Sequence, residues 1–547
     1  MKKIQFQHKS IAGLLILFIF NSLCIAKESQ NEKENEKAMN NQISVTLDLE
    51  APQKQISPYI FGINDRADLK KVSPKSIRLG GNRMTAYNWE NNKSNAGSDW
   101  KNQTDDYMLG TVRSSLRNLP AAAALNVSQD AIEHNVPYTL LTLQMAGYVA
   151  NKDGQKTKDN SLDGEDWCKV ENHKNSNFSL HPDKSDHFVY TDEYLNYLGE
   201  MIGKSDSETG FKAYALDNEP ALWEHTHSLI QKEKISAQEL IEKSIDLAKT
   251  IKNFDPAADV FGPSLFGYSA YSALGGDWAL IQAKNFYKYN WFLDYYLEQM
   301  ALAEQENGIR LLDVLDLHYY TEAKGECGKR TCDHFDNDGC IQARINSVRS
   351  LYDPEYKEKS WITDTGAQHF PLLPKIQASI DKYYPGTKLA FTEYNFGGGS
   401  DISGAIAQAD FLGILAEYQV YFASIWAFDK ADYQFAAINM FTNYDDKGGY
   451  FGDSLIKTTS SDDYIVSSFA AKNSSDGKLH IILTNKNIHN KTKVTIDLGS
   501  KDWKLAQNYI LDKSAPLIYH DKKSTKIRGN KLTIELAPLT VNHLVLE

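Results

Sequence analysis

Two glutamates, Glu219 and Glu393, are the clearest candidates for chemistry in this sequence. Glu219 lies in the segment DNEP directly after the apolar run 213–216, and Glu393 directly follows the run 389–392. Paired carboxyl groups suit glycoside hydrolysis, in which one group protonates the leaving oxygen and the other attacks the anomeric carbon or activates a water. A separation of about 5 to 5.5 Å gives retention and about 6.5 to 9.5 Å gives inversion, and the sequence leaves this distance open.

The runs before these glutamates belong to a set of eight short apolar segments separated by longer helical stretches. The eight segments are residues 59–63, 76–79, 138–143, 213–216, 260–263, 312–317, 389–392 and 421–427. Several are apolar on consecutive positions, which is typical of parallel strands buried on both faces. The repeat predicts an α/β fold, a (β/α)8 TIM barrel, whose reactive groups lie at the carboxyl ends of the strands. Glutamates after strands four and seven can therefore converge over the barrel mouth.

The segments on either side of the barrel have the pattern of half-buried strands. Residues 43–57 open with the alternation ISVTLDLE, which has the period of a strand with one buried face. Five further runs of this kind lie at 464–470, 479–485, 492–498, 532–536 and 543–546. We expect residues 58–440 to form the barrel and 441–547 an antiparallel β-sandwich that the strand in 43–57 joins.

The first 26 residues resemble a secretory signal peptide. Two lysines precede the apolar run 11–23, which at about 13 residues is short of the roughly 20 that span a bilayer. A membrane anchor and lipid attachment at Cys24 are the alternatives. Residues 27–42 hold almost no large aliphatic side chains and are expected to be a disordered linker. We expect a secreted, periplasmic or cell-surface protein, and no later segment predicts a membrane span.

The charge and the cysteines exclude some partners. The formal net charge is -12, and loss of residues 1–26 removes three lysines and no acids, which gives -15. This acidity argues against nucleic acid, whose phosphates need basic patches. The mature cysteines, Cys168, Cys327, Cys332 and Cys340, lack the paired spacing of structural zinc. One or two disulfides of open connectivity are expected in an exported protein.

Three long segments resemble glycoside hydrolase family 44. They are RLGGNRMTAYNWENN at 78–92, DNEPALWEHTH at 217–227 and FTEYNFGG at 391–398. The resemblance implies a barrel with an attached β-sandwich that cleaves internal β-1,4 bonds of glucans such as xyloglucan and soluble cellulose with retention. It assigns the acid/base to Glu219 and the nucleophile to Glu393. The resemblance also implies a structural calcium whose ligands the sequence does not place. A plant cell-wall β-glucan is the expected partner, the protein is expected to be a monomer, and no cofactor is expected to be needed for the chemistry.

Two departures from the family pattern bear on substrate preference. A Cys- and Asp-rich loop at 327–340 follows the sixth strand, and Ser400-Asp401 stands where a histidine is expected.

Four polar residues are candidates for supporting roles. Asn218 can hydrogen-bond the sugar 2-hydroxyl, or it is a turn amide. Arg78 can orient Glu393 and lower its pKa, or it forms a structural ion pair. His318 and Tyr320 follow the sixth strand beside the nucleophile, with a core position as the alternative.

Aromatic residues near the strand ends are candidates for sugar binding. Trp89, Trp223 and Trp426 are proposed as stacking platforms, and core packing is the alternative for each. Tyr394, next to Glu393, completes the predicted substrate-binding set.

Other functions fit the sequence less well. An inactive glycan-binding surface protein on the same scaffold and a β-1,4-mannan or xylan hydrolase are the main alternatives. A metal-dependent hydrolase using His225, His227 and His318 lacks the usual zinc spacing. The segment DNDG at 336–339 has calcium-like oxygen spacing, but Ile345 stands where an EF-hand needs an acid.

Overall fold

The computed structural model describes most of the chain from residue 42 onward. The residues it does not describe are 1–41, 66, 153–161, 163–164, 277–287, 327, 329–336, 429, 500–502, 504 and 523–526. The predicted signal peptide, nearly all of the predicted linker, and Cys327 and Cys332 therefore lie outside the described residues. Cys340 is disulfide-bonded, whereas Cys168 is a free and buried thiol.

Eight parallel strands close into a barrel. In chain order they are β3 (Gly62–Asn64), β4 (Ser76–Leu79), β7 (Tyr138–Leu143), β11 (Ala213–Leu216), β12 (Asp259–Leu265), β13 (Val314–Tyr320), β14 (Lys388–Asn395) and β15 (Phe422–Ile425). Each predicted run contains or overlaps one of them, so the barrel is confirmed. The first run differs at its start, because Pro58 begins the 3-10 helix η1 (Pro58–Ile60) and the strand follows at Gly62.

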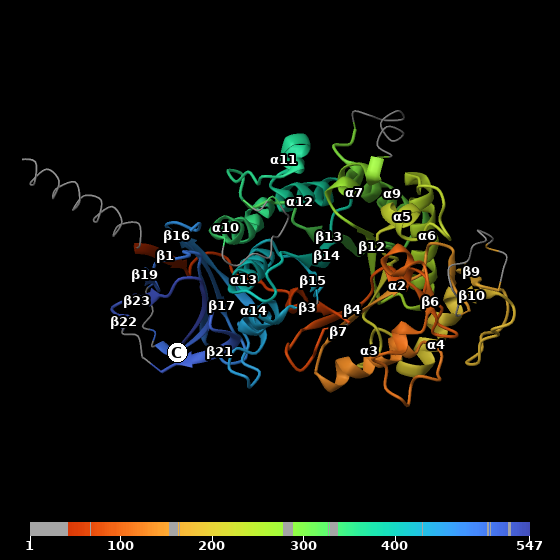
Figure 1. The fold of residues 1–547 in the computed structure, drawn as a ribbon, viewed down its shortest axis with the longest axis horizontal. Helices are drawn as coiled ribbons and strands as arrows, with labels where there is room; N and C mark the ends of the chain where they lie inside the picture. Colours follow the sequence, from red (N-terminus) through yellow and green to blue (C-terminus); the bar gives the residue numbers. More distant parts are fainter. Residues whose placement is uncertain are drawn as a thin grey trace, which may run out of the picture.

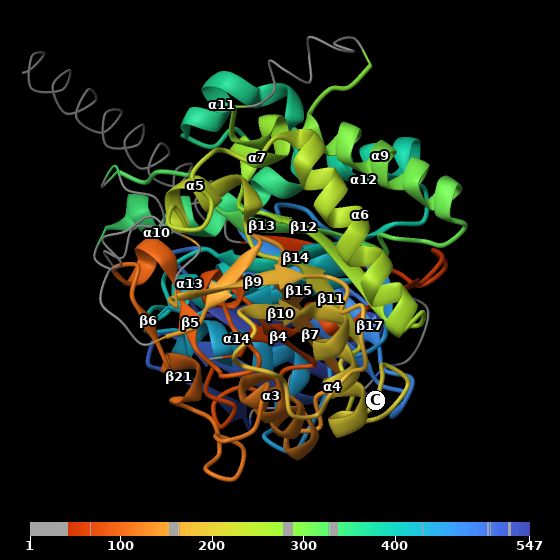
Figure 2. The same ribbon diagram turned by 90° about the vertical axis from the view of Figure 1, so that its right-hand side faces the viewer.

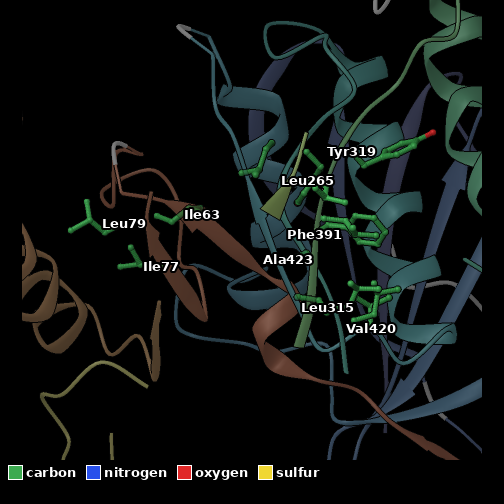
Figure 3. Close-up of a cluster of buried hydrophobic side chains, with 14 of the residues drawn as sticks. Ile63, Ile77, Leu79, Leu265, Leu315, Tyr319, Phe391, Val420 and Ala423 are labelled. Atoms are coloured by element: carbon green, nitrogen blue, oxygen red, sulfur yellow. The ribbon is translucent and has the colours of Figure 1, made fainter. Parts of the chain in front are cut away.

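The barrel strands are buried on both faces. One end of the interior is filled by apolar side chains, namely Tyr138, Leu140, Ala213, Ala215, Phe261, Val314, Ala390 and Phe422. Side chains on the outer face, among them Ile63, Leu315 and Phe391, pack against the surrounding helices (Figure 3). Further along β13 the interior positions hold Asp316 and His318, so the inside of the barrel changes from apolar to polar toward the strands' carboxyl ends.

Helices surround the barrel (Figures 1 and 2). The longer ones are α3 (Ala122–Glu133), α4 (Thr191–Ile202), α6 (Ala237–Phe254), α9 (Phe292–Asn307), α10 (Asp338–Asn346), α12 (Leu372–Tyr383), α13 (Ile402–Glu417) and α14 (Asp432–Thr442). At the start of α6, Ser236 Oγ accepts a hydrogen bond from the Glu239 backbone at 3.1 Å, as an N-cap does. None of the helices in the described residues is long and apolar enough to span a membrane.

Short elements lie in the loops. The helices are α2 (Asn82–Thr85), α5 (Trp223–Thr226), α7 (Tyr268–Ala273), α11 (Trp361–Gly366), η2 (Gly97–Trp100), η3 (Tyr107–Leu109), η4 (Pro220–Leu222), η5 (Leu274–Gly276), η6 (Ser347–Leu351) and η7 (Ala367–His369). The strands are β5 (Ser94–Asn95), β6 (Thr104–Asp105), β8 (Tyr148–Ala150), β9 (Trp167–Glu171) and β10 (Phe188–Tyr190).

The remaining strands form a second sheet system at the other end of the molecule (Figure 1). They are β1 (Gln42–Asp48), β2 (Lys54–Gln55), β16 (Ser454–Ser460), β17 (Val466–Lys472), β18 (Leu479–Asn485), β19 (Thr492–Asp497), β20 (Leu505–Asp512), β21 (Ala515–Asp521), β22 (Ile527–Arg528), β23 (Lys531–Leu536) and β24 (Thr540–Leu546). The N-terminal strand β1 lies between β16 and β19. It runs parallel to β19, so the sheet of the predicted β-sandwich domain is mixed rather than antiparallel throughout.

This sheet folds over on itself through β16. The first half of β16 pairs with β17 and its second half pairs with β1. Val45 of β1, Ile481 of β18 and Val494 of β19 then belong to one apolar core, which both halves of the sheet enclose. The arrangement gives the sandwich-like packing that buries the alternating side chains of each strand.

Buried polar contacts join the sheet domain to the barrel. Asp410 of α13, the helix that follows β14, forms an ion pair with Lys486 at 2.8 Å. The same carboxylate accepts hydrogen bonds from Thr484 Oγ1 at 2.6 Å and Ser467 Oγ at 3.0 Å. The sheet domain thus contacts the helix adjacent to the strand that carries Glu393.

Candidate active site

Glu219, His318 and Glu393 meet at the carboxyl ends of three barrel strands. Glu219 follows β11, the fourth barrel strand, while His318 and Glu393 lie in β13 and β14, the sixth and seventh. His318 Nδ1 is 2.8 Å from Glu219 Oε1 and 3.5 Å from Glu393 Oε2. One ligand-type atom from each residue lies within 4.8 Å of the others. The barrel therefore brings both predicted glutamates to the same nitrogen of one imidazole, Nδ1 of His318.

The backbone around Glu219 is held in an uncommon conformation. Glu219 has a φ of 45°, in the left-handed region that residues other than glycine seldom adopt. Its backbone N–H donates to the Ser264 carbonyl at 3.0 Å. Two residues earlier, the buried Asp217 carboxylate accepts from Thr85 Oγ1 at 2.7 Å and from the Met145 backbone at 2.5 Å. These contacts fix the direction in which the Glu219 side chain leaves the strand end.

The Glu393 carboxylate is held by two donors. Arg78 donates to Glu393 Oε1 at 2.8 Å, and the Tyr320 hydroxyl donates to Oε2 at 2.9 Å. The fully buried Arg78 guanidinium also donates to Asn218 Oδ1 at 2.7 Å and to Asn64 Oδ1 at 3.0 Å. Asn64 was not predicted from the sequence, although a polar residue at the end of the first barrel strand is a usable signal.

Burial and charge separate the pKa values of the two glutamates. Burial raises the pKa of Glu219, and the neighbouring Glu393 charge adds to this effect against the opposing influence of His318. Burial also tends to raise the pKa of Glu393, but the positive charges of His318 and Arg78 outweigh it and hold that pKa below its usual range. One carboxyl group is thus favoured as the neutral acid and the other as the anion, the division that acid and nucleophile roles require.

The two glutamates in turn change the pKa of His318. Burial lowers its pKa, but the charges of Glu393 and Glu219 outweigh this and raise it overall. The Tyr271 hydroxyl donates to the His318 carbonyl, which anchors the strand end at that position. His318 is fully buried, as the core alternative requires, but its ring contacts both glutamates, and a contact with substrate stays a prediction.

Asn218 is buried in a hydrogen-bond network. Its amide oxygen accepts from Arg78, and its amide nitrogen donates to Asn82 Oδ1 at 3.0 Å. A contact with the sugar 2-hydroxyl stays a prediction for this residue.

Two of the predicted tryptophan platforms are wrong. Trp89 is buried and stacks on Tyr194, with ring centroids 5.1 Å apart and planes 4° apart. Trp223 is also fully buried, and its Nε1 donates to the Asn218 carbonyl at 2.9 Å. Both rings are buried, so neither is open to a sugar.

The two remaining predicted aromatic residues, Tyr394 and Trp426, differ in their exposure. Tyr394 faces away from the barrel interior, packs on Phe411 with centroids 4.3 Å apart and accepts from Gln408, so its predicted contact with substrate is also wrong. Trp426 is half-buried after β15, and a Cβ on Gly81 would lie 2.5 Å from its ring. Trp426 keeps an exposed portion, and its platform role stays a prediction.

The alternative histidine metal site does not form. His227 is buried and its Nε2 contacts the Asn82 carbonyl at 2.9 Å, whereas His225 is largely exposed beside Glu224. Over the part of the chain that the structure describes, one group of metal-type side chains converges, and it is Glu219, His318 and Glu393.

That group does not fit calcium. The ion prefers six to eight oxygen ligands. Here the Arg78 cation and the His318 ring occupy the space around the carboxylates. Asn337, in the predicted calcium-like segment, instead caps α10 by accepting from the Cys340 backbone at 3.0 Å. The remaining segment residue with a carboxylate in the described range, Asp338, contacts His489 at 2.6 Å.

A cavity of about 460 Å³ opens beside Glu219. Aromatic side chains that sequence reasoning missed contribute to its lining, namely Phe266, Tyr268, Tyr271, Trp361, Phe370 and Phe428. Trp361 and Phe428 are 41% and 56% exposed. These aromatic residues lie in connections that follow barrel strands. That position alone does not single them out in the sequence, because most loops of this Tyr-rich chain carry an aromatic residue.

A parallel (β/α)8 barrel that presents two carboxyl groups of opposite protonation preference at its fourth and seventh strand ends is the arrangement of a glycoside hydrolase. Comparison with known proteins agrees, since the sequence model of glycoside hydrolase family 44 matches residues 93–323. Endoglucanase A of Paenibacillus lautus is 41% identical over 514 residues, which is 92% of this chain and 72% of that protein.

Solved structures show the same relationship. A crystal structure of a glycoside hydrolase family 44 endoglucanase from Clostridium acetobutylium has a TM-score of 0.89 and 42% identity, covering 92% of this chain and 99% of its own. A Paenibacillus polymyxa family 44 xyloglucanase, solved with xyloglucan, has a TM-score of 0.88 and 41% identity with the same coverage. The chain belongs to glycoside hydrolase family 44.

Proposed function

We propose that this glycoside hydrolase is a retaining endo-β-1,4-glucanase that hydrolyses xyloglucan or cellulose-type polysaccharides. Glu219 acts as acid/base and Glu393 as nucleophile. The observation that carries the proposal is the spacing of the pair, because an oxygen of Glu219 and one of Glu393 lie within 4.8 Å of each other. Retaining enzymes hold their carboxyl groups about 5 to 5.5 Å apart, whereas inverting enzymes need about 6.5 to 9.5 Å to admit a water.

The reaction proceeds in two displacements. In the first, the Glu393 carboxylate attacks the anomeric carbon while neutral Glu219 gives its proton to the departing glycosidic oxygen. In the second, ionised Glu219 takes a proton from a water that attacks the same carbon and releases Glu393. Arg78 and Tyr320 hold Glu393 as an anion in the resting enzyme, and their hydrogen bonds aim its oxygens.

The position of the cavity beside Glu219 supports the proposal that the substrate is a polymer. Since the acid protonates the leaving oxygen, the space next to it receives the leaving part of the chain. Trp361 and Tyr268 lie on its wall and offer the flat apolar surfaces on which pyranose rings stack. The similarity to endoglucanases and to a xyloglucanase supports a glucan backbone cut at internal bonds.

We also propose that the protein is exported and acts on plant cell-wall β-glucan. The N-terminal apolar run and the acidic charge support this. The mass of the protein purified from culture medium tests it, with loss of residues 1–26 as the expected result and an intact, cell-associated chain as the contrary one.

Variants of the two glutamates test the chemistry. Glu219→Gln and Glu393→Gln are each expected to lower turnover of xyloglucan and carboxymethylcellulose by orders of magnitude without unfolding the protein. Glu193→Gln is the control, because Glu193 is a buried glutamate that pairs with Lys174 away from the site. Near-normal turnover in either active-site variant contradicts the proposal.

Azide rescue separates the two roles. With an activated aryl cellobioside, Glu393→Ala plus azide should yield an α-glycosyl azide, because azide enters directly from the face that the nucleophile vacated. Glu219→Ala plus azide should yield the β-azide, formed from the covalent intermediate. The opposite assignment of products would exchange the roles of the two residues.

A polysaccharide panel defines the substrate. Xyloglucan, cellulose, mixed-linkage glucan, mannan and xylan are compared by release of reducing ends and by anomeric NMR of the first products. Release from glucans with β-configured products supports the proposal. Release from mannan or xylan alone, or binding without release, would support the alternative hydrolase or the inactive glycan-binding protein.

A further inference from the structure

A third carboxylate, Asp316, lies inside the barrel next to the candidate active site. It is fully buried on β13, two residues before His318 and therefore on the same inward face of the strand. Its two oxygens are used on opposite sides, because Ser264 Oγ donates to Oδ2 at 2.5 Å and Thr392 Oγ1 donates to Oδ1 at 2.6 Å. One side chain of β13 thus connects the strand before it, β12, to the strand after it, β14.

Both of these hydroxyls belong to β-bulges. The pairing between β12 and β13 skips Ser264, and the pairing between β13 and β14 skips Thr392. Ser264 has a φ of 51°, in the left-handed region, as an extra residue in a bulge can have. Bulges bend a strand and re-aim the side chains beside them.

Each bulge positions one of the two glutamates. The Ser264 carbonyl accepts the backbone hydrogen bond of Glu219 at 3.0 Å. Thr392 already points inward to Asp316, so regular alternation would turn Glu393 toward the helices. The extra residue instead lets Thr392 and Glu393 both face the interior. The Thr392 carbonyl is held in turn by Asn64 Nδ2 at 3.1 Å.

We propose that Asp316 is a positioning residue that sets the placement of Glu219 relative to Glu393 by holding both bulges with one carboxylate. This inference rests on the proposed roles of the two glutamates. Asp316 acts through Ser264 on the acid/base and through Thr392 on the nucleophile.

The charge environment of Asp316 fits this role. Burial raises its pKa, and the positive charges of His318 and Arg78 oppose that rise. Its anion accepts both hydroxyl hydrogen bonds at once, whereas an amide can accept from one hydroxyl and donate to the other. Asp316→Asn therefore preserves both contacts, while Asp316→Ala leaves two bulge hydroxyls without their partner.

The test compares two substrates that differ in their need for an acid. Xyloglucan has a poor leaving group that must be protonated. A 2,4-dinitrophenyl β-cellobioside has a leaving group that departs without a proton, and its burst of dinitrophenolate reports the first displacement alone. Asp316→Ala is expected to lower kcat on xyloglucan about 100-fold at nearly unchanged KM, the effect of a misplacement near 1 Å. Asp316→Asn should recover most of that loss.

The two hydroxyls are then removed separately. Ser264→Ala should slow xyloglucan turnover at least about tenfold, since acid catalysis contributes roughly 10²- to 10⁴-fold, while it spares the dinitrophenolate burst. Thr392→Val should slow both reactions, because it displaces the nucleophile. Asp294→Ala is the matched control, since Asp294 is equally buried and accepts from Ser379 Oγ at 2.5 Å, but on helix α9. It should lower thermal stability without changing the ratio of the two rates.

Wild-type kcat in Asp316→Ala would overturn the inference. So would equal losses on both substrates in Ser264→Ala, since that pattern reports only general loosening of the fold. If Asp316→Ala does not fold, the Ser264→Ala and Thr392→Val pair still decides the question. Failure of the proposed function is a separate result, because it would show as unchanged xyloglucan turnover in Glu219→Gln or Glu393→Gln.

Discussion

Replacement of Lys486 by methionine is expected to destabilise the protein strongly, although the residue lies far along the chain from the active-site glutamates. Lys486 and Asp410 form a 2.8 Å ion pair whose side chains are 2% and 5% exposed. The pair joins the sheet domain to helix α13, which follows the strand that carries Glu393. Lys486→Met removes the charge, together with the hydrogen bond that Lys486 donates to Ser467 Oγ at 2.6 Å, but keeps much of the aliphatic length.

The expected loss is about 3 to 5 kcal/mol in the free energy of unfolding, because removal of one partner leaves the other charge buried and uncompensated. The Thr484 and Ser467 hydroxyls still donate to the Asp410 carboxylate, which places the expected value toward the lower end. The double variant Asp410→Asn/Lys486→Met has no buried charge, so it should recover at least about 1 kcal/mol relative to Lys486→Met.

Urea denaturation followed by far-ultraviolet circular dichroism and by tryptophan fluorescence measures these changes. Lys491→Met is the matched control, because Lys491 forms a 2.7 Å pair with Glu535 on the surface, where both side chains are more than 60% exposed. Its loss should stay within about 1 kcal/mol. A loss of less than about 1 kcal/mol in Lys486→Met, or a double variant less stable than that single variant, would contradict this prediction.

Three further predictions concern the active site. The pH profile of kcat/KM should be bell-shaped, because Glu393 must be ionised and its pKa lies below the ordinary glutamate value, while Glu219 must be protonated and its pKa lies above it. The acidic limb should therefore follow Glu393 and the basic limb Glu219, and a rate that keeps rising on the basic side would contradict this assignment. Trp426→Ala should raise KM for polysaccharides with little loss of stability. Trp89→Ala should instead lower the free energy of unfolding by about 3 to 5 kcal/mol, because its ring is buried in the core. Steady-state kinetics and thermal melts of the two variants measure these effects. Activity should survive treatment with a chelator, since the proposed steps use carboxyl groups alone, and a loss restored by added metal would be the contrary result.

The barrel could be predicted from the sequence because its strands are buried on both faces. Segment 213–216 is apolar at every position, and segment 138–143 is apolar apart from Thr139 and Thr142, a pattern that can be recognised without any knowledge of tertiary contacts. The strands β16, β20 and β21 were missed because they mix polar and apolar residues. In β21 most side chains are partly or fully exposed, so no clean alternation remains in the sequence.

The candidate site was predictable in its residues and less so in its geometry. Glu219 and Glu393 could be chosen because each follows a strand, but the bulge at Thr392 that turns Glu393 inward depends on the pairing of β13 with β14. Tyr394 was misplaced for the same reason, since its direction depends on that bulge. The burial of Trp89 could not be read from its type, because a tryptophan serves equally as a core residue and as a sugar platform.

The proposed mechanism requires that Glu393 forms a covalent bond to the sugar while Glu219 donates and accepts the protons. Incubation with a 2-deoxy-2-fluoro β-cellobioside that carries a good leaving group, followed by peptide mass spectrometry, tests it most directly. The expected result is a single fluorocellobiosyl adduct on the peptide that contains Glu393. An adduct on the Glu219 peptide, or rapid turnover of the reagent with an α-configured product and no adduct, would contradict it.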